Sequence, residues 1–203
     1  MFAEQVKSSI SEILDRSAKI DLLDKEMLTL NLVFMHQVIC ATEDLMKCAI
    51  NEYRDDGGFD KQFNTYMRLH AEEESNHDTW LADDLKNNGI DIKSYPLMRK
   101  AVEMAGTQYY LIKHVHPAAI LGYMAVLEGF PMSLDDVKKL EDKHGESLLK
   151  TLRYHAEHDL YHREEVFEMI DEAPEHLHEI IMQSAVQTAV YIVEVTHQWR
   201  NLT

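Results

Sequence analysis

The stretch HAEHDLYH, residues 155–162, places three histidines and two acids in eight consecutive positions. It lies in a segment of about 146–171 whose composition and hydrophobic periodicity predict an α-helix. An α-helix turns by about 100° per residue, so Asp159 and His162 lie about +40° and −20° from His155. The apolar side chains of this helix fall between about −40° and +60° on the same scale: Leu148, Leu152, Val166 and Met169. His155, Asp159 and His162 therefore lie in the stripe that faces the core.

Ionisable groups in a core-facing stripe are costly to bury unless something satisfies them. One explanation is a hydrogen-bonded cluster of histidine and aspartate within the core. The other is a divalent cation bound by His155, Asp159 and His162. A metal ion would need ligands from further helices as well.

A second candidate segment is HAEEESNH, residues 70–77, in a predicted helix of about 59–87. Glu73 and Glu74 flank the face of His77, and the angle alone does not choose between them. The Glu-x-x-His spacing of Glu74 and His77 is the usual way in which a bundle helix offers a carboxylate and an imidazole to one metal centre. The face of His77 also carries Tyr66, Leu69, Trp80 and Leu81.

A third candidate is Glu128, at the end of the apolar stretch LGYMAVLEGF, residues 121–130. It shares a helix face with Leu121, Met124 and Ala125, which predicts that the carboxylate points toward the core. The alternative is a glutamate exposed at the helix end by the turn at Gly129.

Together these segments supply three imidazoles and three carboxylates from three helices, and no thiolate. Mixed ligation by carboxylates and imidazoles suits two redox-active first-row metal ions better than a structural zinc ion. Carboxylates can bridge two irons, and open coordination positions can then take O2. The predicted ligands are Glu74, His77, Glu128, His155, Asp159 and His162.

The order Glu74-x-x-His77, Glu128, His155-x-x-x-Asp159-x-x-His162 resembles the haem-oxygenase-like diiron oxidases and oxygenases, relatives of the TENA/PqqC-like proteins. The resemblance implies a seven-helix haem-oxygenase-like fold and an O2-dependent non-haem diiron oxidoreductase. Its cofactor would be two iron ions (Fe2+/Fe3+), with O2 as cosubstrate. Glu74, His77 and His155, or a similar subset, would bind one ion. The other would take Glu128, Asp159 and His162, with one carboxylate bridging. Members act on amines, amino acids or fatty acids, so the resemblance leaves the substrate open.

Three alternatives stay open. A ferritin-like diiron carboxylate protein would use Glu43, Glu74/His77, Glu128 and Asp159/His162, but it leaves His155 unused. Another protein of the haem-oxygenase fold is the second alternative. A thiaminase-like hydrolase would need a reactive cysteine in the later helices, and this sequence has none after Cys48. A true haem enzyme could use only His36 as its axial ligand. The third is a helical protein that binds a metal or a partner without catalysis.

The whole chain of 203 residues is expected to form one all-α domain, 1–203. Only seven Gly and four Pro interrupt long runs of helix-forming residues. We predict a compact seven-helix bundle. Ser133 and Gly145 would cap its short fifth helix. The expected helices cover about 3–18, 24–54, 59–87, 95–130 with a break near Pro117, 133–145, 146–171 and 173–200.

The formal net charge of −16 makes a nucleic acid or an anionic membrane an unexpected partner. The expected partner is a small-molecule substrate, and a homodimer is an open alternative to a monomer. Lys113 is the one cation that we can suggest for an amino-acid-like substrate. Cys40 and Cys48 stand about two turns apart on one helix, too far to form a disulfide. Reduced thiols, and an N-terminal segment without a basic region followed by an apolar block, predict a cytoplasmic protein.

Overall fold

The computed structural model describes residues 1–53 and 57–200, apart from the side chains of residues 159 and 160. This part of the chain forms nine α-helices and three short 3₁₀ segments. The all-α bundle expected from the sequence is therefore confirmed. The helices are α1 (Phe2–Leu14), α2 (Lys25–Asn51), α3 (Gly58–Glu73), α4 (His77–Asn87), α5 (Arg99–His114), α6 (Ile120–Leu127), α7 (Leu134–His144), α8 (Lys150–Asp171) and α9 (Glu175–Arg200).

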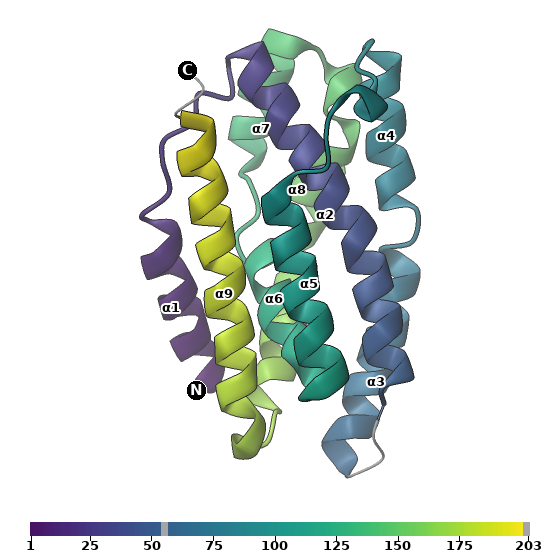
Figure 1. Cartoon of the computed structure of the whole chain (residues 1–203), viewed down its shortest axis with the longest axis vertical. Coiled ribbons are helices and arrows are strands. Elements are labelled where there is room, and N and C mark those ends of the chain that lie inside the picture. Colours follow the sequence, from purple (N-terminus) through teal and green to yellow (C-terminus); the bar gives the residue numbers. More distant parts are fainter. Residues whose placement is uncertain (54–56, 201–203) are drawn as a thin grey trace.

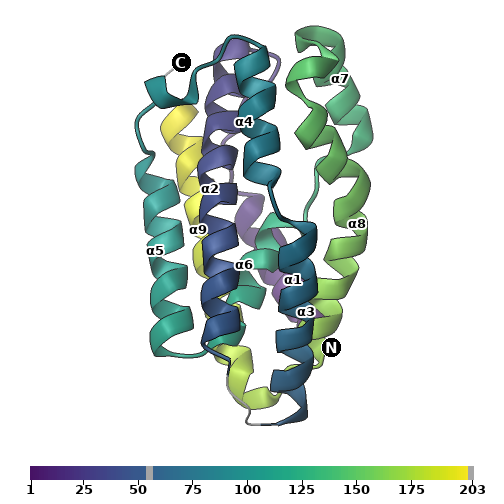
Figure 2. The same cartoon turned by 90° about the vertical axis from the view of Figure 1, so that its right-hand side faces the viewer.

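The long helices run side by side along the longest axis of the molecule (Figure 1). α9 packs against α1, α5 and α6, and α2 packs against α3, α4 and α5. Figure 2 shows α3 and α4 following each other along the length of the molecule, beside α2. α8 packs against α1, α4, α6 and α7. None of the described helices combines the length and the apolar character that a membrane span requires.

The segment predicted as one helix over about 59–87 is in fact two helices. α3 ends at Glu73, α4 begins at His77, and Asn76 between them has a φ of 70°. Asparagine tolerates this left-handed conformation better than most residues, which allows the chain to turn without glycine. The segment 95–130 also divides, at the expected break near Pro117. These two divisions account for nine helices instead of seven.

The predicted start of α7 is confirmed. The Ser133 hydroxyl accepts a hydrogen bond from the Asp136 backbone N–H at 3.1 Å, which caps the helix. Gly145 follows the last residue of α7 with a φ of 94°, a conformation that favours glycine.

The close packing of α6 on α9 depends on Gly122. Every residue from Ile120 to Val126 is buried. A Cβ atom at position 122 would lie 2.6 Å from the Ala185 amide nitrogen and 2.9 Å from Ser184 Cβ. Because neither neighbour can yield without moving α9, glycine sets the distance between the two helices.

We predict that Gly122→Ala lowers the free energy of unfolding by about 1–3 kcal/mol, because the added methyl group overpacks the α6–α9 contact. Gly106→Ala is the matched control. Gly106 lies inside α5, and a Cβ atom there would meet nothing within 4 Å. We expect this variant to be about 0.5–1 kcal/mol more stable than the wild type. Urea unfolding followed by circular dichroism measures both, and equal stability of the two variants would contradict the described packing.

Candidate metal centre

A first cluster, consisting of Glu74, His77 and His155, lies where α3 and α4 meet α8. One ligand atom from each residue lies within 4.8 Å of those from the other two. His77 Nδ1 is 2.8 Å from Glu74 Oε2, and His155 Nε2 is 3.9 Å from the same oxygen. The structure therefore brings these three residues together, as the sequence predicts.

Both imidazoles of the first cluster are held in place by their surroundings. His155 Nδ1 donates a hydrogen bond to the Thr151 carbonyl oxygen at 2.9 Å, which directs Nε2 toward Glu74. The His77 ring packs against Trp80 and Tyr154, with ring centroids 4.4 and 5.3 Å apart. His77 Nε2 is buried and has no hydrogen-bond partner among the described residues. An imidazole fixed in this way offers a metal ion a preoriented nitrogen.

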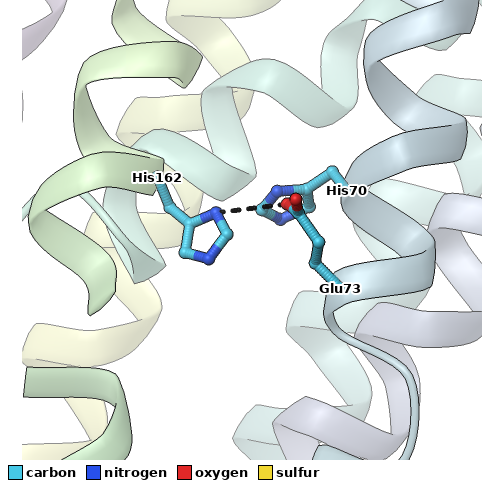
Figure 3. A group of neighbouring side chains, drawn as sticks. All are labelled: His70, Glu73 and His162. Atoms are coloured by element: carbon cyan, nitrogen blue, oxygen red, sulfur yellow. Dashed lines mark ion pairs between the residues drawn. The ribbon is translucent and has the colours of Figure 1, made fainter. Parts of the chain in front are cut away.

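A second cluster combines His70, Glu73 and His162 with Glu128. Ligand atoms of His70, Glu73 and His162 lie within 4.8 Å of one another. His162 on α8 faces His70 and Glu73 on α3, with His162 Nδ1 3.8 Å from Glu73 Oε2 (Figure 3). Glu128, which follows α6, reaches the group through a 3.1 Å contact between its Oε1 and His70 Nε2.

The second cluster contains buried polar atoms that lack hydrogen-bond partners among the described residues. They are His70 Nδ1, Glu128 Oε2 and His162 Nδ1. His70 and His162 are only 1% and 7% exposed. Leaving such an atom unsatisfied costs about 1–3 kcal/mol. With His77 Nε2, four atoms of the kind that bind metal ions are unsatisfied in one region of the core.

The contacts within the two clusters shift the pKa values of Glu74 and His70. Burial opposes ionisation of Glu74, but hydrogen bonds from His155 and His77 hold the pKa of its carboxyl well below the usual range. Burial alone would lower the pKa of His70. The surrounding carboxylates, Glu128 foremost and then Glu74 and Glu73, together outweigh burial and raise the pKa of His70 to about 8. Without a metal ion, the carboxylates are therefore held by imidazoles.

His70 is the residue that the sequence analysis missed. It precedes His77 by seven residues, which places it about 20° away on a continuous helix. This seven-residue spacing could have identified His70 as a residue on the same helix face as His77. Glu73, which the angle alone could not separate from Glu74, lies in the second cluster instead of the first.

Three further residues considered in the sequence analysis are not placed in either cluster: Asp159, Glu43 and Lys113. The side chain of Asp159 lies outside the described residues, so its predicted role as a ligand stays a prediction. Glu43 forms an ion pair with Lys47 at 2.6 Å. Lys113 forms an ion pair with Glu52 at 2.5 Å.

Comparison of the sequence with models of protein families and with curated proteins finds no match. Solved structures do match. One is a domain of unknown function with a haem-oxygenase-like fold from Shewanella denitrificans, 19% identical, with a TM-score of 0.57 over 98% of this chain and 89% of that chain. Another is a TenA homologue from Pseudomonas syringae pv. tomato, 12% identical, with a TM-score of 0.74 over 98% of this chain and 93% of that chain. At these identities the likeness concerns the fold, and the chain has a haem-oxygenase-like fold.

Proposed function

We propose that this protein is a non-haem diiron enzyme that uses O2 to oxidise or fragment a small molecule. The observation that carries the proposal is the pair of clusters, in each of which ligand atoms of three residues lie within 4.8 Å of one another, beside four buried polar atoms without hydrogen-bond partners among the described residues. Imidazoles and carboxylates that converge in this way are the ligands that first-row metal ions take in proteins, and a bound ion would also satisfy the donor atoms that coordinate it. The absence of thiolates from both clusters favours iron or manganese over a structural zinc ion.

Each cluster supplies one set of ligands. Glu74, His77 and His155 would hold one ion. His70, Glu128 and His162 would hold the other. The family resemblance adds Asp159 to this second set, and Glu73 lies close enough to join it. Two iron ions, when bound, supply the electrons and the coordination positions for reaction with O2.

The protein itself contributes orientation and exclusion of water. The hydrogen bond from His155 to Thr151 and the aromatic contacts of His77 fix two imidazoles before any ion binds. Tyr66 places a buried hydroxyl beside His70, at a ring-centroid distance of 5.6 Å. Burial, reinforced by Glu128, raises the pKa of Tyr66 well above its ordinary value, so the phenol keeps its proton near the second cluster. Apolar side chains that line much of the neighbouring cavity would limit the access of water to the reacting groups.

The ferritin-like alternative is weakened by two observations. The fold is haem-oxygenase-like, and the ferritin-like pattern has no use for His155, which lies in the first cluster. The alternative of a protein that binds metal without catalysis has the same ligands and differs only in its reaction with O2.

We predict that the metal-free protein takes up two Fe(II) ions per chain under anaerobic conditions. His155→Ala should weaken binding of one ion by at least about tenfold, since even partners of metal ligands are worth about 10–100-fold. The control is His158→Ala, because His158 is exposed on the same helix and bonds to the Tyr154 carbonyl oxygen. Calorimetry and elemental analysis measure the stoichiometry. One ion per chain, zinc retained against excess Fe(II), or full occupancy in His155→Ala would contradict this assignment.

A separate prediction concerns His70, which was not among the ligands expected from the sequence. We expect His70→Ala to lower occupancy of the second cluster and to leave the first cluster filled, because His70 touches only the second. The doubly substituted protein His70→Ala/His155→Ala should then bind neither ion. If His70→Ala retains two ions with unchanged affinity, His70 serves packing and not coordination.

The proposed reaction predicts that the Fe(II)-loaded protein consumes O2 and that one class among amines, amino acids and fatty acids accelerates this uptake. An oxygen electrode, with mass spectrometry of the products, measures the rate and the chemistry. His155→Ala should lose the accelerated uptake, whereas His158→Ala should keep it. If no compound changes O2 uptake while two ions stay bound, the protein is a metal-binding protein and not an oxidase.

A further inference from the structure

A cavity of about 450 Å³ lies beside the two clusters and has the size of a small-molecule site. Glu74, His155 and Glu128 line it, so it reaches ligands of both clusters. It also reaches Leu14 of α1 and Ile192 of α9, so it crosses the bundle. Most of its wall is apolar, including Phe34, Val38, Ile39 and Leu152. An elongated hydrocarbon body would bury apolar surface along this wall.

The charged groups that line the cavity are carboxylates, apart from His155. Glu43 and Asp78 join Glu74 and Glu128 in the wall, and no Lys or Arg lies among the described lining residues. Lys47 is held by Glu43 and Lys113 by Glu52. In the metal-free protein, a substrate carboxylate would thus meet negative side chains without a side-chain cation to offset its charge.

Asp78 is the carboxylate best placed to bind a ligand. Its Oδ1 accepts the Thr79 backbone N–H at 2.7 Å, which orients the group. Its Oδ2 receives only a weak contact from the Cys40 thiol, at 3.9 Å, among the described residues. Burial, followed by the influence of Asp78, raises the pKa of the Cys40 thiol to about 11, so the thiol adds no negative charge.

The neighbours of Asp78 do not neutralise it. Burial lowers the pKa of His36, the nearest imidazole on α2, so His36 is uncharged at neutral pH. Asp78 makes no ion pair with a lysine, arginine or histidine in the described part of the chain. It also lies outside both ligand clusters, so ions bound there leave its charge available. An ammonium group would supply both the charge and the hydrogen-bond donors that Oδ2 lacks.

We propose that the cavity binds an apolar amine, with its hydrocarbon body along the wall and its protonated amino group at Asp78. That this ligand is the substrate rests on the proposed function, whereas its binding does not require the reaction. Among amines, amino acids and fatty acids, the cavity therefore favours amines. The amino acid and the fatty acid would each bring a carboxylate into an acidic wall.

Binding of three probes of equal length tests the class: octylammonium, octanoate and 1-octanol. Calorimetry would be run on the metal-free protein and on the anaerobic Fe(II)-loaded protein. We expect octylammonium to bind at least tenfold more tightly than octanoate to the metal-free protein, where no bound ion offsets the carboxylates. Octanoate binding to the metal-free protein as tightly as octylammonium would overturn the proposal, and so would the failure of octylammonium to bind.

Substitution of the carboxylate tests the position of the amino group. Asp78→Asn should remove at least tenfold of the affinity for octylammonium and leave that for octanol within twofold. Asp78→Glu, which keeps the charge, should restore part of it. Asp83→Asn is the control, since Asp83 is exposed on the same helix and absent from the cavity wall. An unchanged preference for octylammonium in Asp78→Asn would overturn the assignment.

A cavity-filling substitution tests the position of the hydrocarbon. Ile39→Phe should weaken the binding of octylammonium and of octanol equally, because both ligands bury their hydrocarbon chains against the same wall. Unchanged binding of both would place the ligand elsewhere and contradict the proposal. The two proposals fail separately. If the protein binds the amine but consumes no O2, the ligand assignment stands and the oxidase function is refuted. If only fatty acids accelerate O2 uptake, the oxidase function stands and the amine assignment is refuted.

Discussion

The structure depends on one constraint: imidazoles and carboxylates gather on the inward faces of the helices, and several of their polar atoms are buried without hydrogen-bond partners among the described residues. The helices bond their own backbones, so these side chains must find partners among themselves or in a bound ion. Glu74 with His77, and Glu128 with His70, form two such partnerships and still leave polar atoms of both pairs unsatisfied. The pairs offset part of the cost of burial, but the atoms left without partners still destabilise the fold. This makes a ligand the better explanation of their presence.

The packing of the apolar helices determines whether the polar groups can meet. Glu128 follows α6, which is buried and lies close to α9 at Gly122. From this position its carboxylate reaches across to His70 on α3. α8 contributes His155 to one cluster and His162 to the other, seven residues and about two turns apart on the same helix. The distances within the clusters therefore follow from how closely whole helices approach.

Helical periodicity predicts side-chain direction where a helix is continuous and not where it is interrupted. His155 and His162 on α8 are predicted to face the core, and both side chains turn inward in the structure. The break after α3 could not be predicted, because Asn76 adopts a left-handed conformation without the glycine or proline that usually signals one. His70 lies two turns before His77 and outside the Glu-x-x-His spacing, so that spacing does not reveal it. The cavity could not be predicted, since its wall combines residues from helices far apart in the sequence.

The break between α3 and α4 has a further consequence. Glu73 and Glu74 are neighbours in the chain, yet the first lies with His162 and the second with His155. A single peptide unit thus joins the two clusters, and a backbone shift that improves one carboxylate's position displaces the other. Ions at the two places would then be thermodynamically linked: filling one changes the affinity of the other, and the effect has the same size in both directions. Each ion would keep its own set of ligands, and this peptide unit would tune how strongly each set binds.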